Sequence, residues 1–151
     1  MKPFEFSLQA VATVRENEEA RAREAYAHAV RLRRQIAAKQ QEIECGIHEN
    51  LVECGQSFGQ AVHAEKVVQI QATLRVLRAR LKEFSAEAAQ LQAAVDEKWR
   101  QLVLARQRRE VVSKLRDRQF ASHQAEDARV GQVSMDEMAA LRGAGALAYK
   151  G

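Results

Sequence analysis

The chain has 151 residues and a formal net charge of +4, with 29% charged but only 5% aromatic residues. Proline occurs once and helix-forming residues dominate, a composition typical of a long helix or coiled coil. The mean hydropathy of −0.43 and the lack of a long uncharged apolar run argue against a transmembrane segment. The first five residues also lack the apolar core of a secretory signal peptide, so we expect a cytoplasmic protein.

A first helix is predicted over residues 5–50. Pro3 suits a position at or just before its start, because the amide hydrogen that proline lacks has no partner in a first helical turn. Six apolar residues then recur at the spacing of a helix that packs against one partner. They are Ala22, Ala25, Ala29, Leu32, Ile36 and Ile43, and Lys39 occupies one position of the same row. Half of the six are alanine, so this apolar seam is thin.

The interval from Gly46 to Gly59 loses this pattern and contains three glycines, at positions 46, 55 and 59. A glycine-bracketed break between two heptad segments predicts the bend of a hairpin, at about residues 51–60. With the turn near residue 57, antiparallel folding brings residue i opposite roughly residue 114 − i. The alanines at 22, 25 and 29 should then face residues 84–91, small side chains against larger ones.

The second predicted helix covers residues 61–128 and carries the strongest seam of the chain. Nine apolar residues alternate at spacings of three and four, which indicates a coiled coil rather than an ordinary amphipathic helix. They are Val67, Ile70, Leu74, Leu77, Leu81, Phe84, Ala88, Leu91 and Val95. Past Val95 half of the seam positions are polar or charged, so we expect the overhanging end of this helix to be basic and poorly paired. Trp99, just off the seam, is expected to pack at its edge. The seam requires a partner helix, in the same chain, in a second copy or in another protein.

A capping-box spacing from Ser134 to Glu137 predicts a short third helix over residues 135–142, which Gly143 should stop. The remaining residues to 151 are expected to fray. The fold class predicted from these patterns is all-α: one domain formed by a long antiparallel two-helix coiled-coil hairpin with a short C-terminal helix.

Basic residues are concentrated between Arg100 and Arg118, where seven basic residues oppose two acidic ones. This local excess indicates an acidic partner or phosphates. One hypothesis is a basic coiled-coil nucleic-acid-binding protein that dimerises through Val67–Val95. In leucine-zipper DNA binders, however, the basic region precedes the zipper, whereas here it follows the seam. Docking against an acidic protein surface agrees better with a long helical pair.

Neither catalysis nor a metal site is indicated. Cys45, His48, Cys54 and His63 are the residue types that bind zinc, but their spacing matches no compact zinc module. No serine or cysteine has a base and an acid placed near it in the pattern, and a helical hairpin offers no concave active site. We therefore expect a protein that is not an enzyme and needs no cofactor.

Two stretches of the chain resemble the FliJ family of flagellar type III export proteins. The opening Phe4–Val11, followed by Val14–Glu19, is similar to the start of that family. The stretch Lys114–Phe120, followed by Glu126-Asp127 and Met135-Asp136-Glu137, resembles its C-terminal pattern at matching separations. The stalk protein of injectisomes has a similar pattern, and the aromatic-rich start favours the flagellar family.

The resemblance implies a stalk whose open end, made of both termini, inserts into the hexameric flagellar export ATPase, promotes its activity and links it to the export gate protein. Some members also handle export chaperones. Nucleic acid is not an expected partner, and the protein would meet the cytoplasmic face of the inner membrane at the flagellar base only through its partners. A type III secretion chaperone is a further alternative.

Carried onto this sequence, the family's ATPase-facing end comprises Val14–Glu19 and Arg109–Gln119. The residues expected to dock are Arg15, Glu16, Arg109, Arg116, Asp117, Arg118 and Gln119. The family's gate-contacting patch lies nearer the bend. Leu77 matches it, whereas Arg80 and Phe84 occupy neighbouring positions of the patch with a different residue type.

Overall fold

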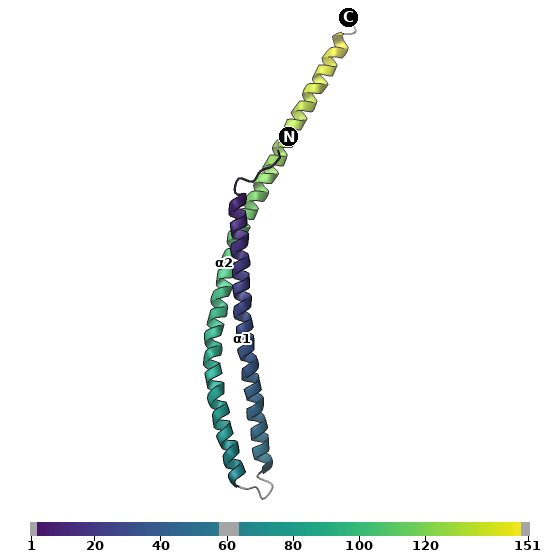
Figure 1. The fold of residues 1–151 in the computed structure, drawn as a ribbon. Helices are drawn as coiled ribbons and strands as arrows, with labels where there is room; N and C mark the ends of the chain where they lie inside the picture. The colour runs from purple at the N-terminus through teal and green to yellow at the C-terminus, as the bar shows by residue number, and fades with distance from the viewer. Residues whose placement is uncertain (1–2, 58–63, 149–151) are drawn as a thin grey trace. The chain divides into compact units, whose positions relative to one another are not determined.

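The computed structural model describes residues 3–57 and 64–148. Two helices make up almost all of this part of the chain: α1, Gln9–Ser57, with 49 residues, and α2, Ala64–Ala148, with 85 residues (Figure 1). No strand occurs within the described residues. The all-α prediction is confirmed, and the helices pack against each other as a hairpin.

The chain enters α1 later than predicted. The backbone N–H of Gln9 donates to the carbonyl of Phe6 at 3.0 Å, and α1 begins at Gln9 rather than at residue 5. The preceding residues are not helical because they place the two phenylalanine rings against other parts of the chain: Phe6 is buried, and Phe4 packs on aromatic residues of α2. Pro3 therefore lies too far ahead to start the helix.

The glycines do not end α1. The helix continues through Gly46 and Gly55 to Ser57, so the predicted helix end at 50 and the bend over 51–57 are wrong; positions 58–60 of that bend lie outside the described residues. One glycine in a helix interior costs only about 1 kcal/mol relative to alanine. At Gly46 an added Cβ would lie 3.7 Å from Cδ1 of Leu77, an ordinary contact distance, so the packing there does not require glycine.

The C-terminal prediction is also wrong, because α2 has no break between residues 128 and 135. Gly131 and Ser134 both lie inside the helix, which continues past Gly143 to Ala148. The side-chain amide of Gln132 donates to Asp136 at 3.1 Å across the predicted start of the third helix. Starting a new helix requires a costly first turn, so continuing through one glycine is favoured. Residues 149–151 of the predicted tail lie outside the described part.

Contacts between residues divide the chain into two compact units, one of which joins two segments that are far apart in sequence. The hairpin unit is Glu19–Leu104, and the terminal unit joins Met1–Glu18 to Ala105–Gly151. The single domain expected from the sequence remains a prediction.

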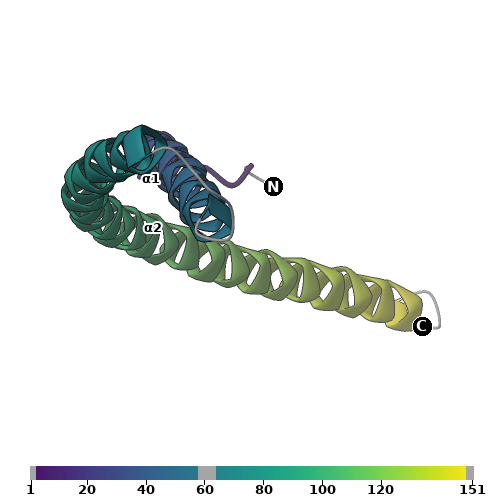
Figure 2. The same ribbon diagram turned by 90° about the horizontal axis from the view of Figure 1, so that it is seen from below.

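In the hairpin unit, the two helices lie side by side and antiparallel (Figure 1, Figure 2). Its buried apolar residues come from both helices and are seam residues of the predicted pattern: Ala29, Ile36, Ile70, Leu74 and Ala88. The strong seam of α2 is therefore covered by α1 of the same chain. This arrangement contradicts the hypothesis of a dimer zipper formed by Val67–Val95.

The register of the hairpin differs from the predicted one. Lys39 was expected opposite residue 75, but its ammonium lies over the ring of Phe84, 5.7 Å from the centroid. Gln40 donates to the Ser85 hydroxyl at 3.3 Å in the same register. The alanines at 22, 25 and 29 therefore do not face residues 84–91. The cause is the length of α1, which runs seven residues beyond its predicted end and moves the bend toward higher residue numbers.

In the terminal unit, the start of the chain packs along α2. Phe6, Ala12 and Ala105 are buried. The Phe4 ring makes edge contacts with the rings of Phe120 and His123, with centroids 5.3 and 5.6 Å apart. Beyond these contacts, the part of α2 drawn in yellow has no other described segment beside it in either view (Figure 1, Figure 2).

Candidate docking surfaces

Most basic residues that α2 contributes to the terminal unit lie in the part of the helix that packs against the start of the chain. Six basic and two acidic residues occur between positions 105 and 118, whereas positions 124–142 carry four acidic and two basic residues. The sequence predicted that the unpaired end of the long helix would be basic. The structure corrects this: the start of the chain covers one face of the basic stretch, and the stretch without a described neighbour is acidic.

Three of the predicted docking residues lie together. Glu16 of α1 and Arg109 and Arg116 of α2 line one narrow cleft between the helices. Ala12, Val112 and Ser113 complete its lining. The carboxylate of Glu16 shares this cleft with two guanidinium groups and reduces their local positive charge. Glu16 and Arg116 are exposed and Arg109 is half-buried, so a partner can also reach all three residues.

The other predicted docking residues are more dispersed. Arg15 donates to Glu18 at 2.7 Å, so it pairs within its own helix. Asp117 and Arg118 are exposed, whereas Gln119 is half-buried. The structure therefore does not gather all seven residues into one patch. It distributes them around a pair of helices.

Exposed apolar side chains on both helices of the terminal unit lie in or beside the segments predicted to face the ATPase, but the sequence analysis did not name them as docking residues. Val11 and Val14 line a shallow hollow on α1 with Ala10, Arg15 and Glu18. On α2, Val111 is 67% exposed and Leu115 is also exposed. The signal that could have revealed them is their position outside the heptad seam, because an apolar residue there cannot be covered by the partner helix.

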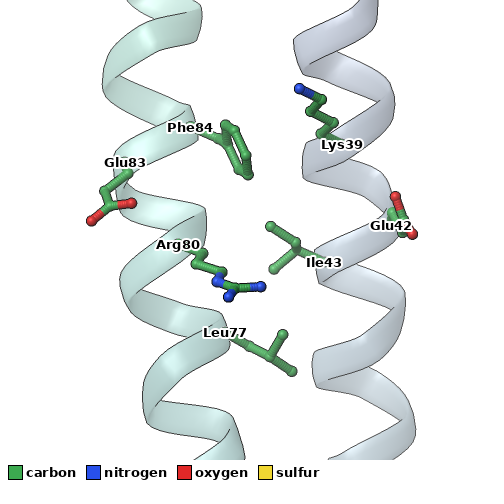
Figure 3. A pocket seen from close by; sticks show the side chains of 7 residues that line it. All are labelled: Lys39, Glu42, Ile43, Leu77, Arg80, Glu83 and Phe84. Atoms are coloured by element: carbon green, nitrogen blue, oxygen red, sulfur yellow. The ribbon is translucent and has the colours of Figure 1, made fainter.

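A groove crosses the hairpin unit between α1 and α2 (Figure 3). It has a volume of about 490 Å³ and includes all three residues predicted to contact the gate: Leu77, Arg80 and Phe84. Its other lining residues, which were not predicted, are Lys39, Glu42, Ile43 and Glu83. In Figure 3 the side chains of Leu77, Arg80 and Phe84 point toward α1, and Ile43 points toward them.

The groove combines an apolar floor with charges of both signs. Phe84 is held by the cation of Lys39 over its ring, an interaction that restrains both side chains. Arg80 and Lys39 contribute positive charge, while Glu42 and Glu83 contribute negative charge at the groove margin. Such a surface suits a partner with an apolar side chain and mixed polar flanks.

The cysteine and histidine residues do not form a metal site in the part of the chain that the structure describes. Cys45 and His48 line a shallow hollow with Gln41, Glu44 and Glu49. No group of three or more His, Cys, Asp or Glu residues among the described positions has the arrangement to hold a metal ion. His63 lies outside those positions. Within the same residues, neither helix has a stretch apolar enough to cross a membrane.

Comparison with known proteins identifies the family. The model of the flagellar FliJ protein family matches residues 4–147. The chain belongs to the FliJ family. The match covers both units and confirms the resemblance to this family, whose proteins belong to flagellar or type III export systems. Among curated proteins, none matches the chain.

One solved structure similar to this FliJ family member is described as that of a YscO homolog, CT670, from Chlamydia trachomatis. The two sequences are 17% identical, and the similarity covers 92% of this chain and 94% of that chain with a TM-score of 0.45.

Proposed function

We propose that this protein is a non-enzymatic stalk of flagellar type III protein export, and that its terminal unit docks into the hexameric export ATPase. The observation that supports this most strongly is the exposure of apolar side chains on both helices of the terminal unit, represented by Val14 and Val111. A partner that bound one helix would cover only one of these side chains. A ring that surrounds the helix pair would cover both.

The basic stretch of α2 supports the same proposal. Exposed arginines such as Arg118 create a positive field that attracts an acidic surface over roughly 8–10 Å at physiological salt. Such charges increase the rate and set the orientation of docking more than they increase affinity. The exposed valines would then supply the buried contact area. FliJ membership makes a flagellar export ATPase the partner to test first.

The decisive experiment measures ATP turnover by the export ATPase with and without this protein. We expect stimulation by the wild type, and a large loss of stimulation for the Arg109→Glu/Arg116→Glu/Arg118→Glu variant. A second variant, Val14→Asp, removes an apolar contact without changing the arginines. The matched control is Arg75→Glu/Arg78→Glu/Lys82→Glu, which reverses three exposed charges in the hairpin unit. Unchanged stimulation by both terminal-unit variants would overturn the docking proposal.

We further propose that the groove in the hairpin unit contacts the export gate protein. Phe84 is suited to anchor the contact because Lys39 already restrains its ring, which reduces the entropy lost on binding. Binding of the purified cytoplasmic part of the gate protein should weaken with Phe84→Ala. The exposed Val76→Ala variant of the same helix serves as the control. Equal binding by both variants would exclude the groove.

In this proposal the protein reaches the cytoplasmic face of the inner membrane at the flagellar base through the ATPase and the gate. Export chaperones are additional candidate partners. A co-sedimentation assay with membranes that contain or lack the gate protein tests the first point. Binding to membranes that lack the gate would contradict it.

A further inference from the structure

The outer face of α2 in the terminal unit carries a second row of residues at heptad spacing. Counting back from Ser122 in alternating steps of four and three residues gives Arg118, Leu115, Val111 and Arg108. All five are exposed, and Val111 is 67% exposed. The residues of α2 that are half-buried in this unit lie on a different face of the helix. No described segment of the chain therefore covers this row.

The same steps counted forward from Ser122 give Glu126, Arg129, Val133 and Asp136. These residues are also exposed, and Val133 is 48% exposed. Arg129 donates to Glu126 at 2.8 and 3.1 Å within the helix. We call the nine residues in both directions, with Ser122 at the centre, the outer stripe. Its spacing reads the same in both directions from Ser122.

A stripe with this symmetry can pair with a second copy of itself running in the opposite direction. With Ser122 opposite Ser122, the basic half of one copy faces the acidic half of the other. Arg118 then lies opposite Glu126 of the second copy, and Arg108 lies opposite its Asp136. Two-fold symmetry repeats each pair, so four opposite-charge pairs form in one interface. A parallel arrangement in register would instead place Arg118 against Arg118 and Glu126 against Glu126, which repel each other.

The uncharged residues match in the same antiparallel register. Val111 lies opposite Val133 of the second copy, and Leu115 lies opposite Arg129, whose aliphatic stem can cover it. At the axis the two Ser122 side chains are small enough for the helices to approach closely. Each Ser122 hydroxyl can both donate and accept a hydrogen bond, so the two hydroxyls can pair with each other across the axis.

We propose that the outer stripe of α2 is a self-association surface, in which two copies of this protein pair antiparallel about a two-fold axis at Ser122. The charge pairs are solvent-exposed and the apolar contacts are few, so the dimer is weak and depends on protein and salt concentration. Because Arg118 also belongs to the proposed ATPase-docking residues, a copy paired in this way would present less of its basic surface to a ring.

Cysteine cross-linking of the isolated protein tests the register and does not depend on any other partner. In a background with Cys45→Ser and Cys54→Ser, the Ser122→Cys variant should form a disulfide-linked dimer under mild oxidation. Gln124→Cys is the control, since position 124 is exposed but lies on another side of the helix. Dimer formation by Ser122→Cys no faster than by Gln124→Cys would overturn the proposal.

The direction of pairing is tested with two more variants in the same background. Val111→Cys and Val133→Cys should each remain monomeric alone but cross-link when mixed. A covalent dimer of Val111→Cys alone would indicate parallel pairing and would refute the antiparallel register.

The charges are tested by sedimentation velocity at low salt. Arg118→Glu should weaken dimerisation on the order of tenfold, because it replaces two attractive pairs by two repulsive ones. Adding Glu126→Arg to it exchanges the two charges and should restore the wild-type dimer. Circular dichroism checks that each variant keeps its helices. Failure of the exchange to restore dimerisation in a helical protein would contradict the pairing.

Discussion

The Trp99 ring of α2 packs against the Tyr26 ring of α1 with their centroids 5.3 Å apart and their planes tilted by 51°. Trp99 nevertheless remains 51% exposed, so this pair closes the edge of the hairpin rather than its core. The prediction that Trp99 packs at the edge of the seam is confirmed. Since tryptophan occurs once in the chain, its fluorescence reports on this single contact.

Replacing Tyr26 should therefore be visible at Trp99. Tyr26→Ala removes an aromatic contact worth about 0.5–1.5 kcal/mol beyond its buried area, and it exposes the indole further. We expect emission at longer wavelength and a lower urea midpoint. Tyr26→Phe keeps the ring and should match the wild type in both measurements. An unchanged spectrum for Tyr26→Ala would mean that the two rings do not meet in solution.

The seam of the hairpin unit should carry most of its stability. Leu74 is 6% exposed, whereas Val76, two residues further along the same helix, is 53% exposed. Leu74→Ala should lower the free energy of unfolding by about 2 kcal/mol or more, because it leaves a cavity between the helices. Val76→Ala should change it by no more than about 0.5 kcal/mol. Equal effects in chemical denaturation would contradict the assigned seam.

Gly46 and Gly55 lie inside α1, the first just before and the second within the stretch where the sequence predicted a bend, and they provide a direct test of the helix. Neither the described glycines nor any other described residue has a positive φ, so alanine fits the backbone. Gly46→Ala and Gly55→Ala should each raise the free energy of unfolding by roughly 0.5–1 kcal/mol. At Gly46 the added methyl group meets Leu77 at an ordinary contact distance, and at Gly55 it meets nothing within 4 Å. Destabilisation by both variants would favour a bend at these positions.

The Glu126–Arg129 pair makes the exposed end of α2 sensitive to acid. The hydrogen bonds and the charge of Arg129 hold the pKa of Glu126 below its ordinary value. The folded state therefore favours the ionised carboxylate of Glu126. The stabilisation that the Glu126–Arg129 pair gives the helix is present above the pKa of Glu126 in the unfolded state. It is lost as the pH falls through the pKa in the folded state. NMR titration of the Glu126 carboxyl carbon should show the lowered pKa. In Arg129→Ala it should return toward the ordinary value, and an unchanged titration would refute the pairing.

The two-helix architecture could be predicted because the apolar residues at heptad spacing are the ones that become buried between the helices. Ile70, Leu74 and Ala88 belong to the predicted seam, and all three are buried. The helix ends were harder to predict, since glycine weakens a helix without ending it, and α1 continues through both Gly46 and Gly55. Phe4 shows the opposite case: its contacts with Phe120 and His123 depend on residues more than a hundred positions away, which no local pattern reports.

The residues of the candidate docking surfaces could be predicted only in part from the sequence. Leu77, Arg80 and Phe84 were carried over from the family pattern, and the structure places all three in one groove. Lys39 and Ile43 complete that groove from α1, and identifying them required the correct register. Val111 lies in the predicted segment Arg109–Gln119 but was not named as a docking residue, because an apolar residue outside a seam becomes informative only when the covered face of the helix is known.

Lys39 has a consequence for how the two helices choose their alignment. A row of apolar residues at heptad spacing can slide by seven positions and still present apolar residues to its partner. In such a shifted hairpin Lys39 would face Leu77 or Leu91, and neither side chain offers an aromatic ring to the ammonium group. Only the alignment with Phe84 provides that ring. A single charged residue within an apolar row therefore favours one alignment over its translated alternatives, and with it the set of side chains of α1 and α2 that meet in the groove.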